Sequence, residues 1–216
     1  MTQLKLITPP ATIPVSVAEM KEYLRIDNAV EDTGIERMIK AATRKLEAYT
    51  GIFFITQTWD VFLDSFVQVS GRKSSPWWSG TKDGAIGDVF GGPGTNILLP
   101  IGVAQSLSEF STYGDDNVAV NETVGNYIVD TVGNRARVGL KVGGVWPQTV
   151  LRANNGIRFR LVVGFGEAAD VPADIKEAIM EFVAHIYENR GDQEEMKIPA
   201  HIEGMVDQYR RYKIGC

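Results

Sequence analysis

The sequence has little of what covalent, metal and catalytic sites require. Its one cysteine, Cys216, rules out a disulfide within the chain, which suits a reducing compartment. The two histidines, His185 and His201, belong to no motif with the close spacing of zinc ligands. With so few histidines and no nucleophile motif, no Ser/His/Asp constellation can be argued. We therefore predict no metal site, no cofactor and no enzymatic activity.

Long apolar runs and an excess of positive charge are missing as well. No stretch of about 18 apolar residues is present, and the N-terminus lacks the pattern of a signal peptide, so we expect no membrane contact. The chain has 27 acidic residues against 22 Lys or Arg, a net charge of −5, which argues against a general nucleic-acid-binding surface. Its 216 residues, 44% of them hydrophobic, suffice for one domain with a substantial core.

Residues 15–63 carry the clearest local signals, those of two helices and a strand. Ser16 and Glu19 have the spacing of a capping box, and the helix that follows is expected to end at residues 27–28. Thr33 and Glu36 repeat that spacing, and Gly51 stands where a left-handed C-cap would close the second helix. The pattern then changes to strand-like alternation, with Trp59, Val61 and Leu63 as its apolar members.

A third helix is predicted to begin near Asp170 and to end at residues 189–191. Asp170 and Asp174 suit the positive end of its dipole, and Pro172 is tolerated in a first turn. Because short helices are marginal alone in water, we expect the three to share one core. Its predicted members are Met20, Leu24, Ile39, Leu46, Ile179, Phe182 and Ile186.

Residues 97–165 have the pattern of β structure. Strands are predicted at 97–99, 103–113, 127–130 and 157–163, with turns at 114–117 and 133–134. No helical pattern separates them, so the sheet should be mainly antiparallel. The predicted fold class is α+β: a small helical bundle, formed by two N-terminal helices plus a C-terminal helix, with an inserted, mainly antiparallel β-sheet region.

The predicted domain organisation is a single domain over residues 1–216. Residues 15–51 and 170–191 form its helical core, and residues 52–165 form the β region with a mobile loop at 67–96. Residues 192–216 form a C-terminal tail with a short helix. The loop is rich in glycine and contains Trp77 and Trp78, which indicate a binding contact. The alternative is that one of the two rings anchors the loop on the sheet.

Residues 164–169, Gly-Phe-Gly-Glu-Ala-Ala, imitate a dinucleotide-binding fingerprint between a strand and a helix. That fingerprint requires a second, parallel strand after the helix, and the sequence continues instead into a polar tail. We interpret the glycines as a tight strand-to-helix turn.

Charge is distributed unevenly over the β region. Residues 102–134 contain five acidic residues and no Lys or Arg, whereas residues 131–166 contain six basic residues and no Asp or Glu. Neighbouring strands of one molecule could pair these opposite charges. The basic side chains could instead face another molecule.

Motifs of a known protein family occur over roughly residues 6–64 and 157–209. The matching segments are Leu6-Ile7-Thr8-Pro9-Pro10, Pro14-Val15-Ser16-Val17-Ala18-Glu19, Leu24-Arg25-Ile26, Glu47-Ala48-Tyr49-Thr50-Gly51, Ile55-Thr56-Gln57-Thr58-Trp59, Gly164-Phe165-Gly166, Asp170-Val171-Pro172-Ala173-Asp174-Ile175-Lys176 and Tyr187-Glu188-Asn189-Arg190. Together they resemble the tailed-phage head–tail connector (adaptor) proteins, also found in prophages and gene transfer agents. Residues 66–96 match no pattern of the family.

The resemblance implies a structural role in the neck of a virion. Such proteins form a ring beneath the portal, typically of twelve copies, which prolongs the DNA channel and docks the next component. The implied partners are the portal protein, a further neck or tail-completion protein, other copies of the chain and DNA that passes without sequence specificity. Assembly would take place in the cytoplasm of a host bacterium. The alternative function is a nucleic-acid-binding DNA-packaging accessory protein that uses the basic residues from Arg135 to Arg160.

A ring needs two complementary surfaces on each copy. We expect Arg158 or Arg160 to face an acidic side chain of the adjacent copy, unless pairing within one molecule occupies them. We further expect the C-terminal segment to contact the portal. The candidate contact residues are Trp77, Trp78, Arg158, Arg160, Glu109, Asp115, Asp116, Glu122, Tyr209, Arg210, Arg211 and Tyr212.

Overall fold

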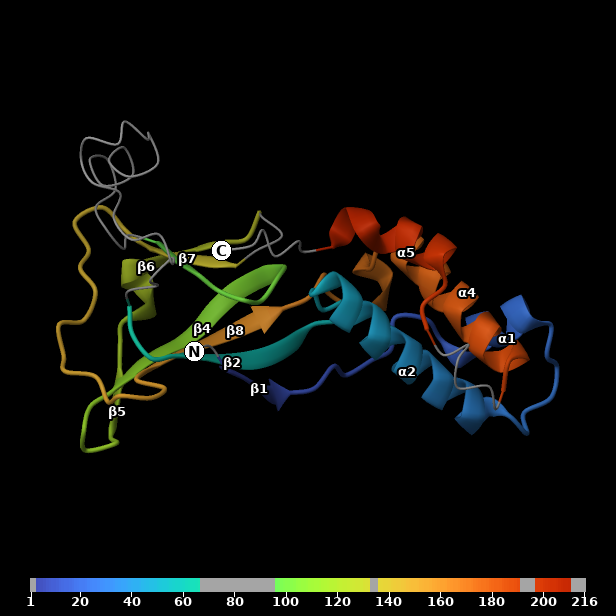
Figure 1. Cartoon of the computed structure of the whole chain (residues 1–216), viewed down its shortest axis with the longest axis horizontal. Coiled ribbons are helices and arrows are strands. Elements are labelled where there is room, and N and C mark those ends of the chain that lie inside the picture. Colours follow the sequence, from blue (N-terminus) through green and yellow to red (C-terminus); the bar gives the residue numbers. More distant parts are fainter. Residues whose placement is uncertain (1–2, 67–95, 133–135, 191–196, 211–216) are drawn as a thin grey trace. The chain divides into compact units, whose positions relative to one another are not determined.

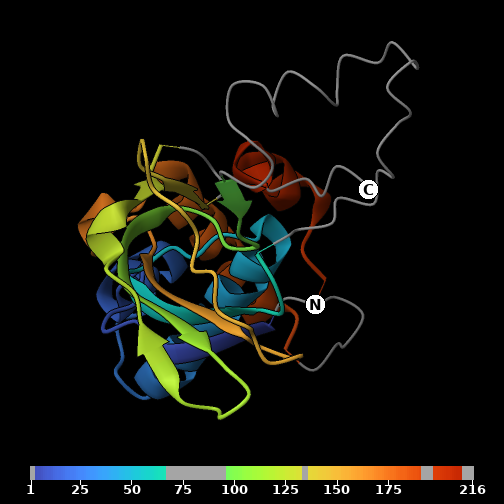
Figure 2. The ribbon, with the colours of Figure 1, turned by 90° about the vertical axis from the view of Figure 1, so that its left-hand side faces the viewer.

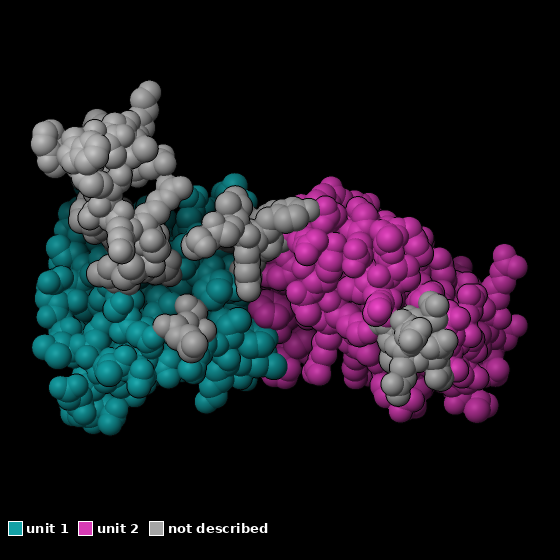
Figure 3. All heavy atoms as spheres, in the orientation of Figure 1, with its two compact units in different colours: residues 1–7, 58–162, 212–216 teal, residues 8–57, 163–211 magenta. Residues whose placement is uncertain are grey.

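The computed structural model describes residues 3–66, 96–132, 136–190 and 197–210 (Figure 1). The chain divides into two compact units (Figure 3). Residues 1–7, 58–162 and 212–216 form the first, here called the β unit, and residues 8–57 and 163–211 form the second, the helical unit. The predicted loop at 67–96 lies almost wholly outside the described residues, as does the predicted turn at 133–134.

The helical unit is built on α2 (Asp32–Thr50) and α4 (Ala173–Glu188), which pack against each other. The shorter helices α1 (Val17–Leu24) and α5 (Ala200–Val206) both contact α4, and a 3₁₀ turn (Asp207–Tyr209) follows α5. The predicted shared core is confirmed, although Leu24 and Ile186 are half-buried and lie at its margin. Its fully buried members are Met20, Ile39, Leu46, Ile179 and Phe182.

The ends of the first two helices were predicted with mixed success. The capping box of α1 is confirmed, since Ser16 Oγ accepts from Glu19 N–H at 3.2 Å and Glu19 Oε2 accepts from Ser16 N–H at 2.7 Å. The Ser16 hydroxyl also donates to Glu19 Oε2 at 2.6 Å, and this hydrogen bond together with that from Ser16 N–H lowers the pKa of the Glu19 carboxyl. The predicted end of α1 at 27–28 is wrong, because Arg25 already adopts a left-handed conformation with φ 57°.

The second predicted capping box, at Thr33, is also wrong. Helix α2 begins at Asp32 with Glu31 as N-cap and no side-chain cap. The Glu31 carboxylate instead accepts from Tyr187 Oη at 2.8 Å and from Arg190 Nη2 at 2.7 Å, both near the end of α4. At the start of α2, Glu31 therefore contacts residues near the end of α4, and no side-chain cap is present. At its other end, Gly51 forms the predicted left-handed C-cap with φ 75°.

The β unit contains two sheets. The five-stranded sheet has the order β1-β2-β8-β4-β5, formed by β1 (Gln3–Thr8), β2 (Gln57–Leu63), β8 (Ile157–Val163), β4 (Ala104–Tyr113) and β5 (Ala119–Asn121). The three-stranded sheet has the order β3-β7-β6, formed by β3 (Asn96–Leu98), β7 (Arg137–Leu140) and β6 (Tyr127–Asp130). The pairs β4–β5, β3–β7 and β6–β7 are antiparallel, as predicted.

Aromatic side chains form the centre of the β unit. Strand β8 alternates as predicted, and its buried Phe159 stacks on Phe110 of β4 with ring centroids 4.6 Å apart. Phe110 also contacts Tyr127 of β6, and Tyr127 stacks on Trp146. The cluster thus links strands of both sheets.

The turn between β8 and α4 brings residues 164–166 against residues 54–56 of the same unit. Phe165 N–H donates to Phe54 O at 3.1 Å, and Thr56 N–H donates to Gly166 O at 2.9 Å. Gly164 and Gly166 have φ values of +117° and +145°, which favour glycine. Among the described residues after α4 there is only α5 and its 3₁₀ turn, with no second parallel strand. The interpretation of these glycines as a tight turn is confirmed.

The half-buried Glu47 of α2 contacts the segment that connects α2 to β2. Glu47 Oε1 accepts from Phe54 N–H at 2.9 Å and lies 3.5 Å from Gln57 Nε2. Burial raises the pKa of the Glu47 carboxyl to about 7, against the smaller opposing effects of the Phe54 hydrogen bond and of Arg44.

Replacing Gly164 by alanine should destabilise the protein by roughly 2–4 kcal/mol. A Cβ at this position would lie 2.5 Å from Ile55 O, and the positive φ would add strain. Gly204→Ala in α5 is the matched control, because nothing lies within 4 Å of its Cβ and alanine favours a helix. Urea denaturation of both variants checks this, and equal stabilities would contradict the described turn.

Glu47 should make the protein more stable at pH 5 than at pH 8. The folded-state pKa is raised from 4.5 to about 7, so the folded state holds its proton longer than the unfolded state. The free energy of unfolding then falls as the pH rises through this interval, by about 2–3 kcal/mol. Denaturation at both pH values, compared with Glu47→Gln, isolates the effect. A variant with the same loss as the parent would assign the pH dependence to other groups.

Candidate functional site

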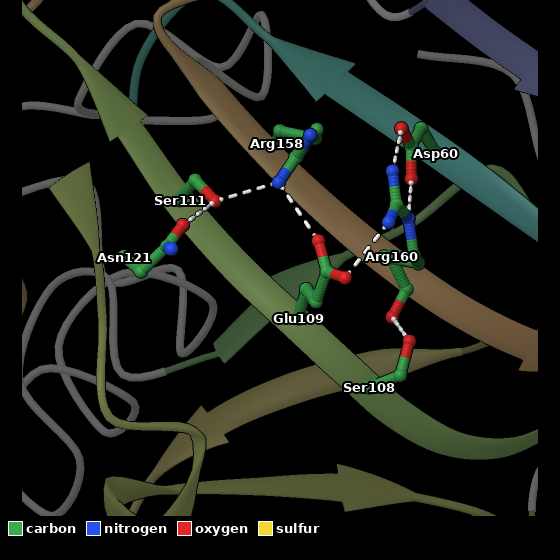
Figure 4. A network of polar contacts seen from close by, with 7 residues as sticks. All are labelled: Asp60, Ser108, Glu109, Ser111, Asn121, Arg158 and Arg160. Atoms are coloured by element: carbon green, nitrogen blue, oxygen red, sulfur yellow. Dashed lines mark hydrogen bonds and ion pairs between the residues drawn. The ribbon is translucent and has the colours of Figure 1, made fainter. Parts of the chain in front are cut away.

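A network of charged side chains connects three strands of the β unit (Figure 4). Arg160 on β8 binds Asp60 of β2 with two hydrogen bonds, at 2.7 Å from Nε and 3.0 Å from Nη2. Its Nη1 donates to Glu109 of β4 at 2.8 Å. Arg158 donates to Glu109 and to Ser111, each at 2.9 Å. The network is continuous from β2 across β8 to β4.

Its two ends differ in exposure. The side chain of Asp60 is 3% exposed and that of Arg160 is 23% exposed, whereas Glu109 is 45% exposed. The paired hydrogen bonds with Asp60, together with both carboxylates, raise the pKa of Arg160. Two guanidinium groups balance two carboxylates, so the network is electrically neutral.

The structure favours pairing within one molecule for the charges of β4 and β8. Arg158 and Arg160 both contact Glu109 of their own chain, in agreement with the alternative of pairing within one molecule. A contact of either arginine with an acidic residue of the adjacent copy stays a prediction. The charge count missed Asp60, because it lies on β2, about a hundred residues before its partner. Its one sequence signal is a charged residue within an otherwise uncharged strand.

Asp115 and Asp116 lie in the turn of the β4–β5 hairpin, as predicted, and both are exposed. Asp116 Oδ1 accepts from Val118 N–H at 3.0 Å, and Asn117 N–H donates to Gly114 O at 3.1 Å. The Asp116 carboxylate thus stabilises the turn, and both carboxylates give it negative charge. Their role as partner contacts stays a prediction. Glu122 accepts from Thr112 Oγ1 at 3.1 Å within the same hairpin.

The remaining described arginines of residues 131–166 also bind their own chain. Arg137 pairs with Asp130. Arg152 lies 4.3 Å over the Tyr113 ring, donates to Asn117 Oδ1 at 3.2 Å and donates to Asn155 O. These contacts tie the β4–β5 hairpin to the loop that precedes β8. They leave a weak basis for a nucleic-acid-binding surface here, and Arg135 lies outside the described residues.

The C-terminal candidates are only partly described. Arg210 lies 4.4 Å over the Tyr49 ring of α2 and donates to Tyr49 Oη at 3.1 Å. The rings of Tyr209 and Phe165 pack edge to face, with centroids 6.3 Å apart. Burial and the nearby Asp174 raise the pKa of the Tyr209 hydroxyl. Both residues therefore help to hold the terminal segment on the helical unit. Arg211, Tyr212, Trp77 and Trp78 lie outside the described residues.

The described residues contain no group of three His, Cys, Asp or Glu side chains that could hold a metal ion. In the same part of the chain, no helix combines the length and apolarity needed to cross a membrane.

Asp60→Asn should destabilise the protein by about 2–3 kcal/mol, because it removes the charge that opposes a half-buried arginine. Asp130→Asn is the matched control, since its partner Arg137 is 56% exposed, and it should cost less than about 1 kcal/mol. Thermal and urea denaturation of both variants measure the difference. If Asp60→Asn is as mild as the control, the buried pair does not stabilise the sheet.

Comparison with known proteins shows which sequence family and which folds the chain resembles. Residues 14–73 match the family of phage gp6-like head-tail connector proteins. A chain from the neck of the empty gene transfer agent (GTA) particle, computed with C6 symmetry, matches with a TM-score of 0.74 and 17% identity, over 98% of this chain and 97% of that chain. Chains from the virion of the native GTA particle and from its neck, computed with C12 symmetry, match with TM-scores of 0.71 and 0.70 at the same identity and coverage.

No curated protein sequence matches the chain. At 17% identity the three structural matches establish a common fold. The resemblance predicted from the sequence is confirmed: residues 14–73 carry the sequence pattern of the phage gp6-like head-tail connector family, and the whole chain has the fold of a gene transfer agent neck protein.

Proposed function

We propose that the chain is a structural neck subunit of a tailed phage or a phage-like particle. It forms a ring beneath the portal, extends the DNA channel and docks the next neck or tail component. The observation that carries this proposal is the match of residues 14–73 to the head-tail connector family. Residues 14–73 include α1, α2 and β2, so the pattern covers the helices that support the core as well as the first strand after them.

The proposed ring has twelve copies, in line with the C12 symmetry used for one of the matching neck structures. Its proposed partners are the portal protein, a further neck or tail-completion protein and its own copies. The proposed site of assembly is the host bacterial cytoplasm, and the proposed final location is the virion neck. The role is structural rather than enzymatic.

The nucleic-acid-binding alternative has lost most of its proposed surface. Arg137, Arg158 and Arg160 form ion pairs with carboxylates of their own chain. The protein carries a net charge of −5, and a ring of such subunits lets DNA pass without holding it. We therefore retain DNA as a partner that passes through the channel without sequence specificity.

The test is assembly of the full-length protein, alone and mixed with the portal protein of the same genome. Sedimentation velocity and negative-stain microscopy should show rings, alone or on the portal. A protein that stays monomeric both alone and in the presence of the portal protein would contradict the proposal. Tight, salt-sensitive binding of the isolated protein to DNA would favour the packaging alternative.

A truncation separates the proposed portal contact from folding. Removing residues 211–216 keeps the contact of Arg210 with Tyr49, which a deletion from Tyr209 would destroy. The shorter deletion should leave the melting temperature unchanged and weaken association with the portal. Unchanged portal binding would exclude Arg211 and Tyr212 as contacts.

A further inference from the structure

The two edges of the five-stranded sheet differ from the rest of the β unit in exposure. Strand β1 neighbours only β2, and strand β5 neighbours only β4 (Figure 1). Every residue of both strands is exposed. Among the described residues, no strand pairs with the outer side of either. The hairpin that carries β5 projects from the β unit in Figure 2.

Both edges present apolar side chains next to an open backbone. On β1, Leu4 is 43% exposed, Leu6 is 39% exposed and Ile7 is 37% exposed. On the β5 hairpin, Val118 is 59% exposed and Val120 is 49% exposed. Soluble proteins protect edge strands with charges, prolines or bulges. Strand β1 has one charged residue and no proline, and β5 has neither.

The charges of the two edges are opposite. Lys5 is the one charged residue of β1. Residues 114–122 of the hairpin contain Asp115, Asp116 and Glu122 and no Lys or Arg. Opposite charges on paired strands favour a defined register, and like charges oppose it. Pairing of β1 with a second β1 would bring two lysines together, whereas pairing with the hairpin brings Lys5 to carboxylates.

We propose that β1 of one copy adds to the outer edge of β5 of the next copy. The sheet then continues from subunit to subunit. This contact is heterologous, since two different surfaces of one chain meet, and it therefore suits a closed ring. It rests on the proposed neck-ring function and specifies one interface in it. Because β5 offers three residues, the contact sets the register between copies while other surfaces add to the binding.

Cysteine cross-linking of the full-length protein tests the proposal. In a Cys216→Ser background, Lys5→Cys is combined in turn with Ala119→Cys, Val120→Cys and Asn121→Cys. Opposite residues of paired strands are close enough for a disulfide. At least one combination should convert the monomer band into a ladder of multimers on a non-reducing gel. Circular dichroism verifies that each variant is folded.

Controls separate the possible outcomes. Arg37→Cys with Val120→Cys places one exposed cysteine on α2 of the helical unit in place of the cysteine on β1, and should give no ladder. Dimers from Lys5→Cys alone would overturn the proposal in favour of β1–β1 pairing. Rings that assemble normally without a ladder from any combination would overturn the edge contact and leave the neck function standing. A parent protein that forms no ring with or without the portal contradicts the neck function, and with it the edge contact.

Discussion

The close approach of residues 164–166 to residues 54–56 is the constraint on which the helical unit depends. Two backbone hydrogen bonds join these segments, and the lack of a side chain at Gly164 allows the contact. The segments lie directly after α2 and shortly before α4, so the turn supports the packing of helices that are far apart in the sequence. At the opposite end of the α2–α4 pair, Glu31 forms an ion pair with Arg190 and accepts a hydrogen bond from Tyr187.

Charge neutralisation determines which surfaces remain for assembly. The arginines of β8 are satisfied by Asp60 and Glu109, and Arg152 is satisfied by groups around the hairpin. Arg158 and Arg160 therefore stabilise the sheet of their own chain. The acidic turn of the β4–β5 hairpin and the apolar edge strand β1 are both exposed, and they differ in charge. A subunit with two unlike surfaces is what a closed ring requires.

Features with a local cause could be predicted from the sequence. The cap at Ser16, the apolar stripes of α2 and α4, the alternation of β8 and the hairpin at residues 114–117 each follow from residues a few positions apart. Contacts between distant segments could not. Asp60 pairs with Arg160, Glu31 binds the end of α4, and Trp146 stacks on Tyr127 only because the fold brings them together. The failed cap at Thr33 has the same origin, since α2 starts at a tertiary contact.

We propose that this chain is a ring-forming component of a particle neck. A cryo-electron microscopy map of the neck, from particles encoded by the same genome, tests this proposal. We expect a ring of density below the portal into which both the helical unit and the β unit fit. A complete map of the neck in which every ring is accounted for by other proteins would contradict it.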